Sequence, residues 1–504
     1  MEEKLQELKT RLAEVADLEH VAAVLEWDQQ TYMPPGGADE RSEQMATVRK
    51  LAHQEFTSDE VGRLLEDLRG QLAARGADPD GYEASFIRAT SRKYERERKL
   101  PTDLVAELAR TTAAAYDAWV KARVHKDFDA FRPHLEKIFE LKRREAACFG
   151  PQDSPYDPLL DEYEPGMKAA QVREVFAELK RELVPLVRAI AAKPEIDDSI
   201  LHRDYDEQKQ WDFGLDVILQ FGYDAERGRQ DKAPHPFTTT FGLGDVRITT
   251  RLHRDLLSSA LMSTLHECGH ALYEQGFDPA FARTPLADSV SLGIHESQSR
   301  MWENLVGRSR GFWKFWYPRL QGVFPGQLGN VRLEVFYKAI NKVELSLIRV
   351  EADEVTYNLH TMLRFELEVD ALEGRLPVKD IPAAWNAKVK EYLGLDVPAA
   401  RDDLGCLQDI HWSNGYIGYF PTYTLGNLAS VQFFEKAIQN VPSIPADIER
   451  GEFGGLLGWL RANIHRHGRK YLPGELIQRV TGGPLNARPY LAYLKRKYSE
   501  IYEL

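Results

Sequence analysis

Cysteine is scarce in this sequence. The 504 residues contain three, Cys148, Cys268 and Cys406, and no two of them form a C-x-x-C pair. An odd number of scattered cysteines argues against a disulfide scaffold and is typical of a chain kept in a reducing compartment. We therefore expect a cytoplasmic protein.

The sequence also lacks any run of about eighteen apolar residues, the length that a membrane-spanning helix needs. Its first fifteen residues are charged and amphipathic, without the apolar core of a signal peptide. Basic residues are in deficit, since 65 Lys and Arg stand against 78 Asp and Glu and give a net charge of -13. Nucleic acid usually binds to a basic face, so we expect neither a membrane nor a nucleic acid as a partner.

A helical pattern covers most of the chain. From residue 1 to about 195, apolar residues recur at three- and four-residue intervals, as in Leu5, Leu8 and Leu12, which is typical of the buried face of a helix. Residues 235–250 differ, because β-branched and aromatic residues flank a turn signal at 242–245, and this predicts a hairpin. The pattern beyond them is helical again. We predict a mainly α fold with a small β-sheet beside the helix around residues 257–272.

The segment His266-Glu267-Cys268-Gly269-His270 lies within that helix and has the form H-E-x-x-H. Residues four apart lie on one face of a helix, so the imidazoles of His266 and His270 can bind one cation while Glu267 points to the same place. This arrangement is typical of a metallohydrolase. A chance match on a solvated helix is the alternative, and a second cluster downstream argues against it.

A catalytic zinc ion requires three protein ligands and one open position for water. The metzincin pattern would place a third His six residues after His270, but that position is Gly276. The segment His295-Glu296-Ser297 instead supplies a carboxylate twenty-six positions after His270, on the next predicted helix. The sequence therefore predicts one zinc ion per chain, held by His266, His270 and Glu296, and leaves open whether cobalt can substitute.

Six motifs in chain order resemble the signatures of the carboxypeptidase Taq family of metallocarboxypeptidases. They are His235-Pro-Phe, Asp245-Val-Arg-Ile-Thr, His266-Glu-Cys-Gly-His, His295-Glu-Ser-Gln-Ser-Arg, Ile348-Arg-Val-Glu-Ala-Asp and Gly405-Cys-Leu-Gln-Asp-Ile-His-Trp. The resemblance implies a large helical metallopeptidase fold with a long, deep groove, and a homodimer. It also implies removal of single residues from peptide C-termini with broad specificity, C-terminal proline excluded. We expect one peptidase domain over 1–504, with a helical, lid-like part at about 1–195 and a zinc-binding, catalytic part at about 196–504.

Catalytic roles follow from the chemistry of these residues. Glu267 is the expected general base toward a water molecule that zinc activates. The developing oxyanion requires a further donor, for which Tyr419 and Tyr416 are the candidates. The stretch from His411 to Tyr419 is also similar to a segment of angiotensin-converting enzyme, in which a Tyr has this role and a His contacts the peptide.

An exopeptidase must also bind the terminal carboxylate of its peptide substrate, which a guanidinium does with two parallel hydrogen bonds. We favour Arg349 over Arg247 for this role. Further groove-lining residues are expected at His235, Asp245, Gln408 and His411, and Asp353 or Asp409 is expected to orient a ligand imidazole.

Two other classes of protein stay open at this point. A zinc oligo-endopeptidase of the same H-E-x-x-H plus Glu type would keep the ligands and need no carboxylate-binding arginine. A non-enzymatic helical scaffold would use neither the metal ligands nor a carboxylate-binding arginine.

Overall fold

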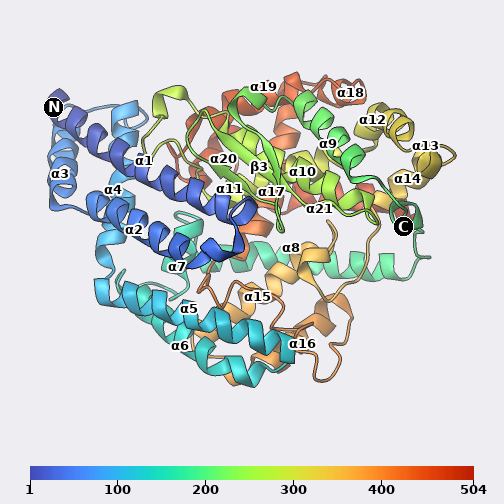
Figure 1. The fold of residues 1–504 in the computed structure, drawn as a ribbon, viewed down its shortest axis with the longest axis horizontal. Helices are drawn as coiled ribbons and strands as arrows, with labels where there is room; N and C mark the ends of the chain where they lie inside the picture. Colours follow the sequence, from blue (N-terminus) through green and yellow to red (C-terminus); the bar gives the residue numbers. More distant parts are fainter.

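The computed structural model describes residues 1–504 and has the mainly helical architecture that the sequence predicts (Figure 1). The first four helices, drawn in blue, form a layer at one end of the molecule: α1 (Glu2–Thr31), α2 (Ala38–Phe56), α3 (Asp59–Ala74) and α4 (Tyr82–Lys99). Their apolar stripes meet in a small core that includes Leu8, Leu64 and Phe86, and Phe281 and Leu286 join it from the later part of the chain. This layer therefore packs largely on itself.

The next five helices belong to a second, much larger core. They are α5 (Thr102–His125), α6 (Phe128–Ala147), α7 (Asp157–Tyr163), α8 (Ala169–Ala191) and α9 (Glu207–Phe221). Apolar side chains of these helices, such as Leu135, Leu179 and Val217, are fully buried. Helices α5 and α6 pack against each other along the lower edge of the molecule in Figure 1.

A three-stranded sheet follows: β1 (Gln230–Lys232), β2 (Thr238–Thr240) and β3 (Val246–Thr250), in the order β1-β3-β2. The predicted hairpin is confirmed, since β2 pairs antiparallel with β3 and Thr239 lies opposite Arg247. Strand β1 pairs parallel with β3 and was not predicted, because three residues show no periodicity. Both β2 and β3 contact α10 (Leu257–Glu274), so the sheet lies beside the helix that carries the H-E-x-x-H motif.

Helices account for most of the remaining chain. They are α11 (Leu292–Arg300), α12 (Arg310–Val323), α13 (Pro325–Leu328), α14 (Leu333–Ile340), α15 (Tyr357–Leu372), α16 (Ile381–Leu393), α17 (Pro421–Asn440), α18 (Ile444–Glu449), α19 (Gly454–Asn463), α20 (Pro473–Thr481) and α21 (Arg488–Tyr502). A π-helical segment, Met301–Gly307, continues α11.

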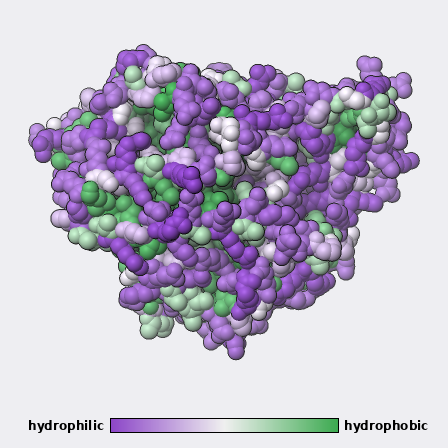
Figure 2. Space-filling model, turned by 180° about the vertical axis from the view of Figure 1, so that it is seen from behind, coloured by the Kyte–Doolittle hydropathy of each residue, from purple (hydrophilic) through white to green (hydrophobic).

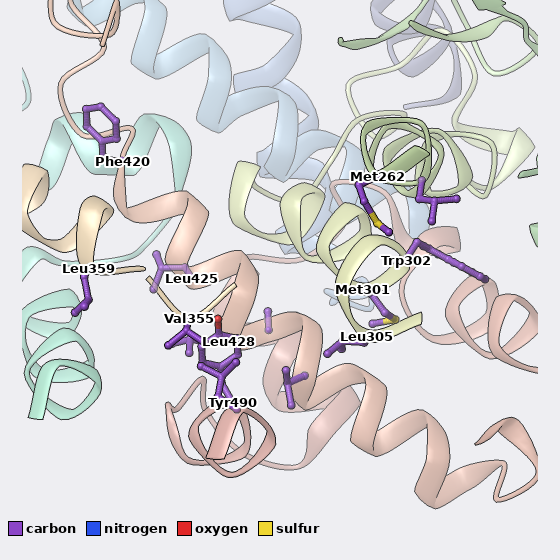
Figure 3. Packing of buried hydrophobic residues seen from close by; sticks show 14 of the residues in the cluster. Met262, Met301, Trp302, Leu305, Val355, Leu359, Phe420, Leu425, Leu428 and Tyr490 are labelled. Carbon is purple, nitrogen blue, oxygen red and sulfur yellow. The ribbon is translucent and has the colours of Figure 1, made fainter. Parts of the chain in front are cut away.

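The two helices α11 and α17 pack together within the large core. Figure 3 shows Leu425 and Leu428 of α17 beside Val355 and Tyr490, while Trp302 lies in a neighbouring part of the same core. The surface is mostly hydrophilic on the face shown in Figure 2, with small apolar patches. None of the helices has both the length and the apolar character required to cross a membrane.

Candidate active site

Three of the predicted site residues meet where α10 and α11 pack against each other. Oε2 of Glu296 lies 3.7 Å from Nε2 of His266 and 3.6 Å from Nε2 of His270. One atom from each side chain, two imidazole nitrogens and a carboxylate oxygen, lies within 4.8 Å of the other two. A set of two imidazoles and one carboxylate fits a divalent ion such as zinc.

Two glycines permit this approach. A Cβ atom at Gly269 would lie 2.6 Å from Cα of Ser299, so the absence of a side chain between the two histidines lets α11 pack directly on α10. A Cβ at Gly426 of α17 would lie 2.8 Å from Cβ of Glu296 on the other side. Glu296 is therefore held between two closely packed helices.

The charge of Glu296 is stabilised by Arg300, one helical turn further on. Nε of Arg300 donates to Oε1 of Glu296 over 2.7 Å, which leaves Oε2 facing the histidines. Burial alone would raise the pKa of Glu296, but the charges of Arg300 and His266 outweigh it and hold the pKa below its ordinary value. An ionised carboxylate is the form that binds a cation.

Glu303 orients the first histidine. Its Oε2 lies 2.9 Å from Nδ1 of His266, so Nε2 of the ring faces Glu296. Burial would raise the pKa of Glu303, but Arg300, His266 and Arg308 hold it well below its ordinary value. The prediction that Asp353 or Asp409 has this orienting role is wrong.

Both aspartates are engaged elsewhere. Asp353 accepts from the N–H groups of Val355 and Thr356 just before α15, while Asp409 accepts from two arginines. Glu303 follows Glu296 by seven residues, or two helical turns. That spacing was the one available sequence signal that it shares the face of Glu296.

Glu267 is held by the small sheet. Its Oε2 accepts from Oγ1 of Thr238, on β2, over 2.7 Å. The side chain is buried, and burial raises its pKa although the charge of His266 and the Thr238 hydroxyl oppose the rise. A carboxylate with a raised pKa suits proton transfer near neutral pH.

A cavity of about 640 Å³ opens over these side chains. The predicted residues that line it are His235, His266, Glu267, His270, Glu296, Arg349, Gln408, Asp409, His411 and Tyr419. The lining also includes Tyr423 of α17 and, from α5, Trp119 and Arg123. Trp119 and Arg123 were not predicted, because a Trp on an amphipathic helix has the pattern of an ordinary core residue and an Arg that of the solvated face.

Arg349 is a buried cation in the wall of this cavity, with 6% of its surface exposed. Its Nε donates to Oδ1 of Asp409 over 2.9 Å, and its Nη1 donates to the Tyr357 hydroxyl over 2.9 Å. Gln408 accepts from the Arg349 backbone N–H over 2.8 Å. The side-chain amide of Gln408 also donates to backbone carbonyls, including that of Leu347. Gln408 thus fixes the Arg349 segment.

Arg247, Asp245 and Tyr416 are not brought to the cavity. The Arg247 guanidinium makes two hydrogen bonds to Asp245, of 2.8 and 2.7 Å, and lies 4.4 Å from the Trp27 ring centroid. Tyr416 has 45% of its surface exposed.

An aromatic group forms part of the cavity lining. The ring centroid of Tyr419 lies 5.3 Å from that of His411 and 5.4 Å from that of Tyr423. Burial raises the pKa of Tyr419 to about 12, so its hydroxyl keeps a proton to donate at neutral pH. Burial lowers the pKa of His411 to about 3, so its ring is neutral.

A helix with an H-E-x-x-H motif, a glutamate from the adjacent helix and a cavity above both define a mainly helical metallopeptidase. The chain matches the carboxypeptidase Taq (M32) metallopeptidases over residues 7–498 and belongs to this family. It is therefore a metallocarboxypeptidase, as the resemblance predicts, and the endopeptidase alternative is not favoured.

Individual relatives match this chain over nearly their whole length. Thermostable carboxypeptidase 1 of Thermus thermophilus is 45% identical over 499 residues, which cover 97% of both chains. Carboxypeptidase 1 of Bacillus subtilis is 37% identical and covers 98% of this chain and 97% of its own. The crystal structure of the M32 carboxypeptidase of Deinococcus radiodurans has a TM-score of 0.95 at 44% identity, covering 99% of this chain and all 100% of that one.

Proposed function

We propose that His266, His270 and Glu296 hold one zinc ion per chain, with cobalt as a substitute. The donor set supports this, since two imidazoles and a carboxylate are a ligand set typical of a catalytic zinc site. Zinc supplies activation of a water molecule and polarisation of the scissile carbonyl when it is bound.

Glu267 takes the proton from water and then passes it to the leaving amine in this proposal. Its Oε2 is held by Thr238, which fixes the carboxylate at the edge of the cavity. Tyr419 is the donor to the developing oxyanion, because it lines the cavity and keeps its proton, whereas Tyr416 does not line it. His235 and His411, which both line the cavity, contact the bound peptide.

The observation that carries the exopeptidase assignment is the buried cation in the same cavity as the three metal-binding side chains. Arg349 and Arg364 share one carboxylate, Asp409, so this wall has an uncompensated positive charge for a terminal carboxylate. We propose release of one residue at a time with broad specificity. We also propose exclusion of C-terminal proline, whose amide nitrogen has no N–H to donate.

We further propose a cytoplasmic homodimer, on the basis of the family resemblance and of three cysteines without disulfides. The helices before about residue 195 act as a lid-like part of a single peptidase domain. That role is supported by Trp119 and Arg123 of α5, which line the cavity.

A digest of one mixed-sequence peptide, followed over time by mass spectrometry, tests the function. Residues should leave singly from the free-acid C-terminus, and the C-terminally amidated peptide should be cleaved far more slowly. Metal analysis of the same preparation should give one ion per chain, and a chelator should stop the reaction. Internal cleavage of both peptides at equal rates would overturn the assignment.

A further inference from the structure

Helix α7 packs against the segment that carries Tyr419, although none of the residues of α7 lines the cavity. The ring of Tyr163, at its end, is edge-on to that of Tyr419, with 5.2 Å between centroids. Gly418 has a φ of +99°, and a Cβ there would lie 2.8 Å from the carbonyl carbon of Leu159. The segment that carries Tyr419 thus rests on the backbone of α7.

The residue that follows α7, Glu164, reaches a different part of the site. Its side chain is buried, with 2% of its surface exposed, and the carboxyl accepts from the backbone N–H of Gly293. A Cβ at Gly293 would lie 2.5 Å from Oε1 of Glu164, so any larger residue would displace the carboxyl. Glu164 forms no ion pair with Lys, Arg or His, which is unusual for a buried carboxyl.

Gly293 belongs to the first turn of α11. Two further N–H groups of that turn are bound locally. Oγ of Ser291 accepts from Ile294 over 3.0 Å. The backbone oxygen of Ser291 accepts from His295, also over 3.0 Å. Among the partners of these three backbone N–H groups, Glu164 is the one that comes from a distant part of the sequence. The next turn carries Glu296, three residues after Gly293.

We infer that Glu164 is a positioning residue for the metal centre: by binding the Gly293 N–H, it holds the start of α11 where Glu296 meets His266 and His270. This inference rests on the metal site proposed above. Glu164 forms no hydrogen bond or ion pair with any of the three metal ligands, so its effect passes through the backbone of α11. Burial raises the pKa of Glu164 to about 8, although the Gly293 N–H and Ser291 oppose the rise, and a neutral amide in its place is a close mimic at pH 7.

The test measures the zinc dissociation constant of the full chain by competition with a chelator. Glu164→Ala leaves the Gly293 N–H without a partner and should weaken zinc binding by about 10- to 100-fold, the usual effect of losing a partner that orients a ligand. Glu164→Gln retains an acceptor oxygen and should stay within about threefold of the parent.

Gly293→Ala provides a second test in case Glu164→Ala fails to fold. Its added methyl should displace the Glu164 carboxyl and weaken zinc binding in the parent. In the Glu164→Ala background the same methyl should have almost no further effect, because the carboxyl that it would displace is absent.

Asp157 is the matched control, at the opposite end of α7. It is also a buried carboxylate that accepts from a backbone N–H, that of Ala169 at the start of α8, over 2.8 Å. Asp157→Ala should lower the melting temperature and leave the zinc dissociation constant unchanged.

His266→Ala separates the two proposals. Loss of zinc in His266→Ala together with parent-like affinity in both Glu164→Ala and Gly293→Ala would overturn the role of Glu164 alone. Zinc retained by all of these variants would overturn the metal site and the positioning role together. An equal loss of zinc affinity in Asp157→Ala would show that the loss in Glu164→Ala comes from general destabilisation, and this would also overturn the inference.

Discussion

The Asp409 carboxylate accepts a hydrogen bond from Nε of Arg349 over 2.9 Å in the wall of the cavity that contains the metal-binding side chains. Its other oxygen accepts from Arg364 over 2.6 Å. Burial would raise the pKa of Asp409, but the two guanidinium groups hold it well below its ordinary value. Asp409 therefore fixes Arg349 in place without neutralising both cations.

Arg349→Ala should lower kcat/KM for free-acid peptides. The loss should correspond to about 2 to 5 kcal/mol of free energy, the usual cost of truncating one partner of a buried charge pair. C-terminally amidated peptides, which lack the charge, should be poor substrates for the parent and lose little more in the variant. Steady-state kinetics on one peptide in its free-acid and its amidated form measures the two values of kcat/KM. Arg247→Ala is the control, because its guanidinium pairs with Asp245 outside the cavity lining. A selective loss on free-acid peptides in Arg247→Ala would transfer the role to that residue.

Glu267→Gln should keep the zinc content of the parent and lower kcat by roughly two to four orders of magnitude, the usual contribution of a general base. The amide is nearly isosteric and can still accept from Thr238, so the local structure is preserved. Metal analysis and single-turnover kinetics on the same sample make the comparison. Zinc loss together with activity would show that Glu267 is structural.

Glu303→Ala should raise the zinc dissociation constant by about 10- to 100-fold, because His266 then loses the acceptor that orients its ring. Glu303→Gln should have a smaller effect, since its amide oxygen can still accept from Nδ1. Chelator competition followed by fluorescence measures the constants. Parent-like affinity in Glu303→Ala would mean that packing alone orients the ring.

Tyr419→Phe should lower kcat by roughly 10²- to 10³-fold with little change in KM, as expected when one donor to an oxyanion is removed. Tyr416→Phe should leave both nearly unchanged, since Tyr416 is half exposed and lies outside the cavity lining. Measuring kcat and KM of the two variants on one peptide shows which of the two tyrosines is the donor. Equal losses would require a closed conformation that brings Tyr416 to the substrate.

The sequence determined features that depend on local spacing. His266 and His270 share a face because an α-helix repeats every 3.6 residues, and apolar residues at the same period predicted the helices. The β2–β3 hairpin was predicted from β-branched and aromatic residues on both sides of a turn signal. The six ordered motifs were enough to recognise the family. The role of Glu303 was within reach of the same argument, two turns after Glu296, but a carboxylate in an amphipathic helix is usually solvated.

Only the tertiary structure decided which distant segments meet. Arg349 and Arg247 are chemically identical in the sequence, and the structure brings the first to the cavity beside Asp409 and pairs the second with Asp245. The structure likewise brings Tyr419, and not Tyr416, to the cavity. It also brings Glu164 to Gly293 across 129 positions of the chain. Periodicity assigns a side chain to one face of its own helix. Which face of another element it contacts depends on the packing of the whole core, where the absence of a Cβ at Gly269, Gly293 or Gly426 sets how closely two segments approach.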